Sequence, residues 1–302
     1  DKYRLTATMK QPAFGSYTFS LAPQSLLLNY DAWTVSDGNT ISITPSGINV
    51  SNFVLSRNSQ QLSINSASSA ADAPINVRFS NFRLATITGF VQADTTFADG
   101  LMNGNVVLSD IMKQPVFTSD LAINDVSIRK DTLGNATIRV NNLVQDTYEA
   151  DVRLTGRGND LALTGKYFVK TENSSYDLVL DVRQLQLNTV EGIFMGAIKD
   201  ASGQLKGKVA FNGSLNDPNI DGRLVFDNAA VNVTMLNSKF TVDQEQLVIV
   251  NNEGIRFSTF TVRDETGNTI MIDGMAGTTN FINYNFNLNV VANNFRAANT
   301  TK

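Results

Sequence analysis

Residues 284–290 read YNFNLNV, so every second residue is large and apolar and each residue between is asparagine. Successive side chains of a β-strand point to opposite faces, and this alternation therefore predicts a strand with one apolar and one polar face. The same period of two recurs at residues 17–21, 41–43, 75–79, 136–140, 150–154 and 178–182. Turn signals rich in Gly, Asn, Asp and Pro separate these segments. The sequence therefore predicts antiparallel strands from end to end.

Helix is expected to be a minor component. No segment carries a sustained apolar stripe at a spacing of 3.6 residues, although residues 189–199, TVEGIFMGAIK, could form two helical turns. The single Trp33 is expected to pack in a core or at a sheet edge.

Composition excludes several classes of protein. The 302 residues include 24 Lys and Arg against 28 Asp and Glu, and a formal charge of −4 argues against nucleic acid as a partner. Histidine and cysteine are both absent, which removes disulfides, thiolate or imidazole metal ligands and Ser-His or Cys-His catalysis. We therefore expect no enzyme, no metal site and no cofactor.

Acidic residues at even spacing are the remaining candidates for chemistry. Asp177 and Asp181, and also Asp243 and Glu245, could share a strand face and serve acid–base catalysis or bind a cation. We interpret them instead as solvated strand faces, because no recognised catalytic or calcium-binding motif accompanies them.

The chain repeats itself at an offset of 103 residues. Residues 75–128 align without a gap on residues 178–231, so that Gly104 meets Gly207 and Pro115 meets Pro218. We predict repeats at roughly 1–74, 75–177 and 178–285, with 286–302 opening the next. The whole of 1–302 is expected to be a single elongated fragment, cut from a longer chain between repeats.

These observations predict an all-β fold: an elongated, repeat-built antiparallel sheet, curved into a groove like a half-pipe, with an apolar concave face and a minor short helix. A closed β-sandwich is the alternative, because an alternating sequence does not show whether its apolar face is open or sealed.

Residues 203–226, GQLKGKVAFNGSLNDPNIDGRLVF, resemble the repeated glycine-and-proline pattern of the TamB and AsmA-like envelope protein family. Residues 254–262, Asp264, Gly267, 270–274 and 288–301 are similar to the carboxyl-terminal region of TamB proteins.

This resemblance implies a periplasmic segment of an envelope protein whose inner-membrane anchor lies outside the fragment. It also implies an outer-membrane partner of the Omp85 type (TamA or BamA-like), and a hydrophobic β-groove for phospholipid transfer between the membranes or for outer-membrane protein assembly. Phospholipid acyl chains would then be the ligand. The candidate groove residues are Leu178, Leu180, Val182, Leu224, Phe226, Val231, Val233, Ile270, Ile272, Phe286, Leu288 and Val290.

Two functions without a lipid ligand remain open. A β-rich scaffold would dock other proteins by pairing with a strand edge. A stalk built of repeats would need neither an open groove nor an exposed edge.

Overall fold

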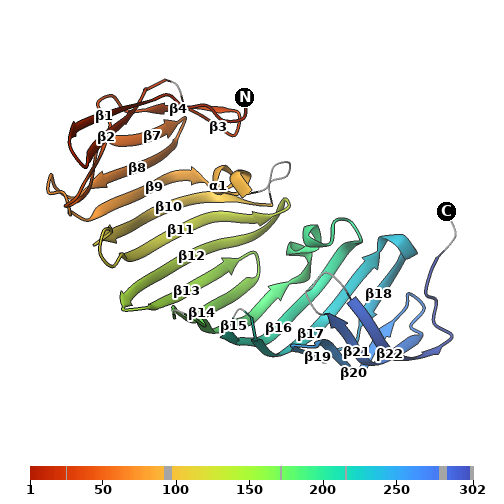
Figure 1. Ribbon diagram of the computed structural model, residues 1–302. Helices are drawn as coiled ribbons and strands as arrows, with labels where there is room; N and C mark the ends of the chain where they lie inside the picture. Colours follow the sequence, from red (N-terminus) through yellow and green to blue (C-terminus); the bar gives the residue numbers. More distant parts are fainter. Residues whose placement is uncertain (25, 92–96, 171, 215, 279–283, 300–302) are drawn as a thin grey trace. The chain divides into compact units, whose positions relative to one another are not determined.

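The computed structural model describes residues 1–24, 26–91, 97–170, 172–214, 216–278 and 284–299 (Figure 1). Strands hold 70% of the residues and helices 6%, and the strands form antiparallel sheets, which confirms the predicted all-β class with a minor helical part. Residues 300–302, which include the end of the segment that resembles the TamB family, lie outside the described residues.

Short connections join most neighbouring elements in the chain. The strands up to residue 128 are β1 (Ala7–Ala13), β2 (Ser16–Leu21), β3 (Leu26–Leu28), β4 (Asp31–Val35), β5 (Thr40–Thr44), β6 (Gly47–Ser51), β7 (Phe53–Arg57), β8 (Gln60–Ser66), β9 (Ile75–Arg83), β10 (Ala98–Ser109) and β11 (Val116–Ile128). The later strands are β12 (Asp131–Val144), β13 (Thr147–Gly156), β14 (Asn159–Phe168), β15 (Ser175–Gln186), β16 (Ile198–Ser214), β17 (Pro218–Val233), β18 (Ser238–Val242), β19 (Gln246–Asn251), β20 (Gly254–Arg263), β21 (Thr269–Thr278) and β22 (Tyr284–Asn293). The alternating segments of the sequence all lie within these strands.

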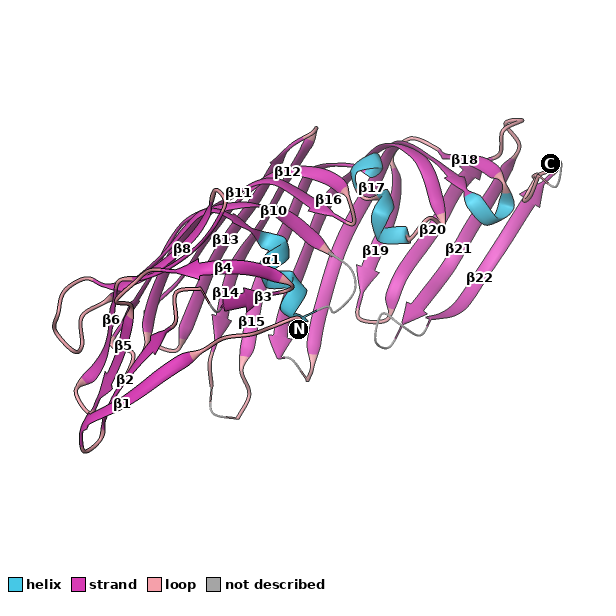
Figure 2. Ribbon diagram, turned by 90° about the horizontal axis from the view of Figure 1, so that it is seen from above, coloured by secondary structure: helices cyan, strands magenta, loops and turns pink. Residues whose placement is uncertain are grey.

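Helical segments are short (cyan in Figure 2). They are α1 (Leu84–Val91) and the 3₁₀ turns η1 (Leu187–Thr189), η2 (Glu191–Phe194) and η3 (Thr234–Leu236). The helical turns predicted at residues 189–199 are thus present as η1 and η2, but they begin earlier and end at Phe194. They end there because Met195 and Gly196 adopt the left-handed conformation, which does not continue the helix.

The chain divides into two compact units. Unit 1 comprises Asp1–Ser127 and Asn135–Ala150, and unit 2 comprises Ile128–Gly134 and Asp151–Lys302. Strands β12 and β13 therefore contribute residues to both units.

Unit 1 contains two sheets whose apolar faces share one core. The smaller sheet has the strand order β1-β2-β5-β6, and the larger runs β3-β4-β7-β8-β9-β10-β11-β12. Ile41 and Val50 of the smaller sheet belong to the same apolar cluster as Leu55 and Phe82 of the larger one. Trp33 is buried there, with its ring centroid 5.5 Å from that of Phe82, which confirms the predicted core packing. In this part of unit 1 the apolar face of the larger sheet is therefore covered.

Unit 2 is a ladder of antiparallel strands. Strand β14 pairs with β15, β15 with β16, and β16 with β17. Strand β17 then pairs with β19 along Asp221–Phe226 and with β18 along Ala230–Val233, so β18 and β19 together occupy one position in the sheet. Both pair with β20, and the ladder ends β20-β21-β22.

Two glycines at the repeat offset allow neighbouring strands to approach closely. Gly104 and Gly207 have φ of 126° and 145°, a region that residues with a Cβ rarely adopt. A Cβ at Gly104 would collide with the carbonyl oxygen of Asp120, and a Cβ at Gly207 with that of Arg223. Asp120 and Arg223 are separated by the same offset of 103 residues as the two glycines. The close approach of the neighbouring strand therefore repeats with the sequence, and it explains why glycine recurs at these two positions.

Candidate functional site

One face of the unit 2 sheet is lined with apolar side chains. Directly opposed residues of paired strands lie on the same face of a sheet. Leu180 of β15 is opposed by Leu163 of β14 and by Val209 of β16. Two residues further along β15, on the same face, Val182 is opposed by Leu161. Three neighbouring strands thus present aliphatic side chains to one side.

The apolar face continues across β17 to β20. Leu224 of β17 is opposed by Val248 of β19, which is in turn opposed by Phe257 of β20. Along the other half of β17, Val231 is opposed by Phe240 of β18. Two residues beyond Phe240, on the same face of β18, Val242 is opposed by Val262 of β20. Both halves of β17 are thus connected, through β18 and β19, to the apolar residues of β20.

The last two strands complete the face. Ile270 and Ile272 of β21 are opposed by Val262 and Phe260 of β20. On the other side of β21, Ile272 is opposed by Val290 of β22. The register places the predicted groove residues together on this one face of unit 2. They are Leu178, Leu180, Val182, Leu224, Phe226, Val231, Val233, Ile270, Ile272, Phe286, Leu288 and Val290.

Burial varies along this face. Val182 on β15 is buried, whereas on β22 the side chains of Phe286 and Val290 are 70% and 48% exposed, with Leu288 between them half-buried. Large apolar side chains are normally withdrawn from water when protein atoms can cover them. The β22 end of the face is therefore open to solvent.

An aromatic cluster occupies the centre of the face. The rings of Phe226 and Phe257 both meet Phe260 edge to face, with centroids 5.7 Å and 5.4 Å away. Of these three residues only Phe226 was predicted from the sequence, because the bulge between Phe257 and Phe260 interrupts the period of two. Residues 254–262 also match residues 47–55 at an offset of 207, which pairs Phe260 with Phe53, and this match is the signal in the sequence that could have identified the cluster.

A segment after β22 returns to the apolar face. Phe295 stacks on Phe240 with centroids 5.5 Å apart. Further along, the backbone N–H of Asn299 donates to the carbonyl oxygen of Leu236 at 2.9 Å. The segment thereby covers Phe240, which shares the face with Val231.

Asp264 fixes the position of this returning segment. One carboxylate oxygen accepts the backbone N–H of Arg296 at 2.8 Å, and the other accepts the backbone N–H groups of Thr266 and Asn268 and the Thr266 hydroxyl. The Arg296 N–H is the chief reason why the pKa of the buried Asp264 lies far below its ordinary value. The carboxylate is therefore a charged structural anchor at neutral pH.

The opposite face of the sheet is polar and carries ion pairs. Asp181 and Lys208 oppose each other across β15 and β16, with Nζ and Oδ2 3.6 Å apart. Arg183 also reaches Asp181, at 3.7 Å. Hydrogen bonds from Lys206 and Gln204 lower the pKa of Asp227. Charge and apolar surface are thus segregated to the two faces of one sheet.

Of the acidic residues considered for chemistry, Asp177 and Asp181 lie on β15, as interpreted. The interpretation as a strand face is wrong for Asp243 and Glu245, which lie in the turn between β18 and β19. Asp181 is paired with Lys208 and Arg183, and Asp243 forms two contacts with the guanidinium of Arg263. Within the described part of the chain, no group of three or more acidic side chains is placed to hold a metal ion.

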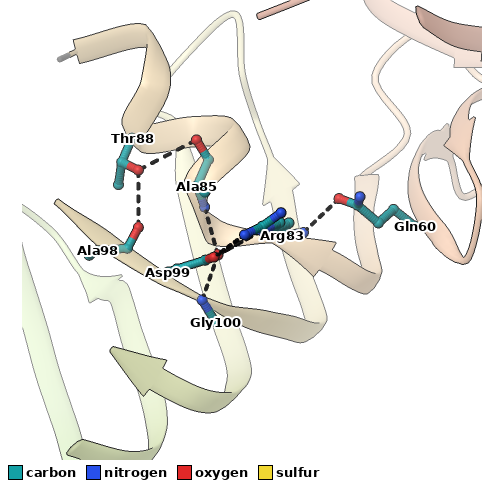
Figure 3. Close-up of polar contacts among 7 residues, drawn as sticks. All are labelled: Gln60, Arg83, Ala85, Thr88, Ala98, Asp99 and Gly100. Atoms are coloured by element: carbon teal, nitrogen blue, oxygen red, sulfur yellow. Dashed lines mark hydrogen bonds and ion pairs between the residues drawn. The ribbon is translucent and has the colours of Figure 1, made fainter. Parts of the chain in front are cut away.

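Unit 1 contains a polar cluster that the sequence analysis did not predict (Figure 3). Arg83, at the end of β9, meets Asp99 of β10 with Nη2 and Oδ2 2.6 Å apart, and the N–H of Gly100 donates to Asp99 at 2.8 Å. Ala85, at the start of α1, also donates its N–H to Asp99. Burial raises the pKa of Asp99, but the hydrogen bonds from Arg83 and Gly100 outweigh it, so the pKa lies below the ordinary value. Asp99 thus joins the start of α1 to the sheet.

Comparisons with models of protein families, with curated proteins and with solved structures found no match to this chain. Among the residues that the structure describes, no helix is both long enough and apolar enough to cross a membrane.

Proposed function

We propose that the apolar face of unit 2 binds the acyl chains of phospholipids, and that the chain has a non-catalytic role in moving lipid. The observation that carries this proposal is the face of apolar side chains that continues, across several bulges, over the paired strands from β14 to β22 and ends in exposed Phe286 and Val290. An apolar surface that stays in contact with water is typical of a site for an apolar partner.

The dimensions of the face suit such a ligand. The strands from β14 to β22 occupy eight positions, because β18 and β19 share one, and at ~4.8 Å per strand the face is about 34 Å across. One acyl chain spans half of a bilayer core, or about 15 Å. The width of the face therefore exceeds the length of one acyl chain.

The cellular setting belongs to the same proposal and rests on the resemblance to TamB and AsmA-like proteins. In that setting the chain is a periplasmic segment of an inner-membrane-anchored protein. Its groove would serve phospholipid transfer between the membranes, assembly of outer-membrane proteins, or both, with an Omp85-type protein (TamA or BamA-like) as partner.

A scaffold that works by strand pairing receives less support. In the smaller sheet of unit 1, β1 is an end strand and all seven of its residues are exposed, as strand addition requires. It nevertheless carries Lys10 and Pro12, the residue types with which proteins prevent pairing at an exposed edge.

Native mass spectrometry tests the proposal. The chain is purified from cells without detergent, and we expect bound species with phospholipid masses that organic extraction removes. The proposal is wrong if the protein is free of lipid under these conditions and takes up none from added phospholipid. A scaffold or a stalk would then be the better explanation of its function.

A further inference from the structure

Two turns of unit 2 hold large apolar side chains out in solvent. The first, residues 192–197, follows the start of η2, and the second, residues 234–237, contains η3. Phe194 is 49% exposed, Met195 74% and Met235 92%. We refer to residues 192–197 and 234–237 together as the apolar turns.

The apolar turns lie at the same end of one strand pair. Ile198 of β16 is opposed by Val233 of β17, and immediately beyond this pair the N–H of Thr234 donates to the carbonyl oxygen of Ala197 at 2.9 Å. A backbone hydrogen bond therefore joins the two turns, although they are about forty residues apart in the sequence.

The backbone of the first turn does not explain its methionine. Met195 has φ of 51° and Gly196 has φ of 84°, so both residues are left-handed. Glycine and asparagine adopt this conformation most readily, and a long unbranched side chain gains nothing there from the backbone. The neighbouring N–H of Gly192 donates to the carboxylate of Asp131, which holds the turn in place. The fixed turn thus holds an apolar methionine side chain at its tip in solvent, where it is available to an outside partner.

The chemistry of the turns favours a lipid surface over a protein. Residues 192–198, GIFMGAI, and 234–238, TMLNS, contain no charged residue. Protein interfaces surround an apolar centre with a polar rim and often include arginine. Insertion into a membrane interface, in contrast, requires apolar side chains and is opposed by every charge that is carried along.

The turns also adjoin the apolar face. Val231 and Val233, which line that face, lead directly into the turn that carries Met235. An acyl chain that leaves the face at this end of β17 would meet the apolar turns first.

We infer that the apolar turns insert into the interface of a phospholipid bilayer and hold this end of the apolar face against it. The inference rests on the proposed function, since the lipid would pass between that face and the bilayer.

A dye at Met195 tests the insertion. The chain has no cysteine, so Met195→Cys provides a unique attachment point for an environment-sensitive fluorophore. We expect its emission to shift to the blue when phosphatidylcholine vesicles are added. Met112→Cys is the matched control, because Met112 is an exposed methionine in the turn between β10 and β11. No shift at position 195, or equal shifts at both positions, overturns the inference.

Substitution of the side chains separates this inference from the proposed function. In a variant with Phe194→Ser, Met195→Ser and Met235→Ser, flotation with phosphatidylcholine vesicles should fall about tenfold or more, because these side chains supply the membrane contact. Phospholipid that copurifies without detergent should remain. Undiminished flotation of the folded variant overturns the inference, and if the variant does not fold, the dye at Met195→Cys decides. A blue shift in protein that never retains phospholipid would contradict the proposed function alone.

Discussion

Phe295 stacks on Phe240 with ring centroids 5.5 Å apart and ring planes 14° from parallel. Because Phe240 is opposed by Val231, this contact places a residue from beyond the last strand on the apolar face of unit 2. The segment after β22 thus belongs to the packing of the sheet.

Phe295→Ala should lower the free energy of unfolding by about 1–2 kcal/mol, because an aromatic pair contributes beyond the area it buries. Phe286→Ala is the control, since the Phe286 side chain is 70% exposed, and it should change stability by less than about 0.5 kcal/mol. Urea denaturation followed by circular dichroism measures both. Equal losses would show that the stacking does not hold the segment.

Asp264→Asn should destabilise unit 2 at neutral pH, because an amide nitrogen would replace an oxygen that accepts N–H or O–H donors. The pKa of Asp264 is lowered by folding, so its contribution is present above the unfolded pKa of about 3.9 and is lost as pH falls towards the folded pKa. The difference in melting temperature between wild type and variant should therefore shrink below about pH 4. A difference that is constant from neutral pH to about pH 2 would contradict this role.

Asp99→Asn should cost about 1–2 kcal/mol of stability, because the charge-assisted bonds from Arg83 and the backbone bonds from α1 and Gly100 converge on this carboxylate. The pair Arg139–Asp120 supplies the control, since both its side chains are more than half exposed. Asp120→Asn should change stability by no more than about 0.5 kcal/mol. Chemical denaturation measures the free energy of unfolding of both variants. Similar losses of stability in the two variants would show that the Asp99 cluster has no structural role.

Lysine substitutions distinguish the covered and the open parts of the apolar face. Val182→Lys buries a charge and should cost about 3 kcal/mol or more. Leu288→Lys should cost about 1 kcal/mol, because a lysine stem beside exposed Phe286 and Val290 can carry its ammonium group to water. Urea denaturation measures the stability, and native mass spectrometry should find the Leu288→Lys variant folded but depleted of lipid. Unfolding of both variants would indicate that the whole face is sealed.

Much of unit 2 could be predicted because antiparallel pairing preserves the period of two. Once Leu180 and Leu288 are assigned to the apolar face of their strands, the residues opposite them on the paired strands must lie on the same face. The recurrence of glycine at positions 104 and 207 was visible in the sequence, but its cause, the close approach of a neighbouring strand, comes from the structure.

Other features depend on contacts that a period of two does not encode. In unit 1, Ile41 alternates like any strand residue, and nothing in its own segment shows that β5 joins a second sheet over Trp33. The bond between Asp264 and Arg296 depends on how the chain returns after β22, and the exposure of Met235 depends on the end of β17. Such long-range arrangements follow from the packing of whole strands.

Site-specific photo-crosslinking on β22 tests whether the apolar face of unit 2 receives lipid. Leu288 is opposed by Gly274 on the apolar face, and the adjacent Asn287 is opposed by Met275 on the other face. In cells, a photoreactive residue at position 288 should capture phospholipid, and the same residue at position 287 should not. Equal capture at both positions, or none at 288 in a folded protein, would show that the apolar face does not receive lipid.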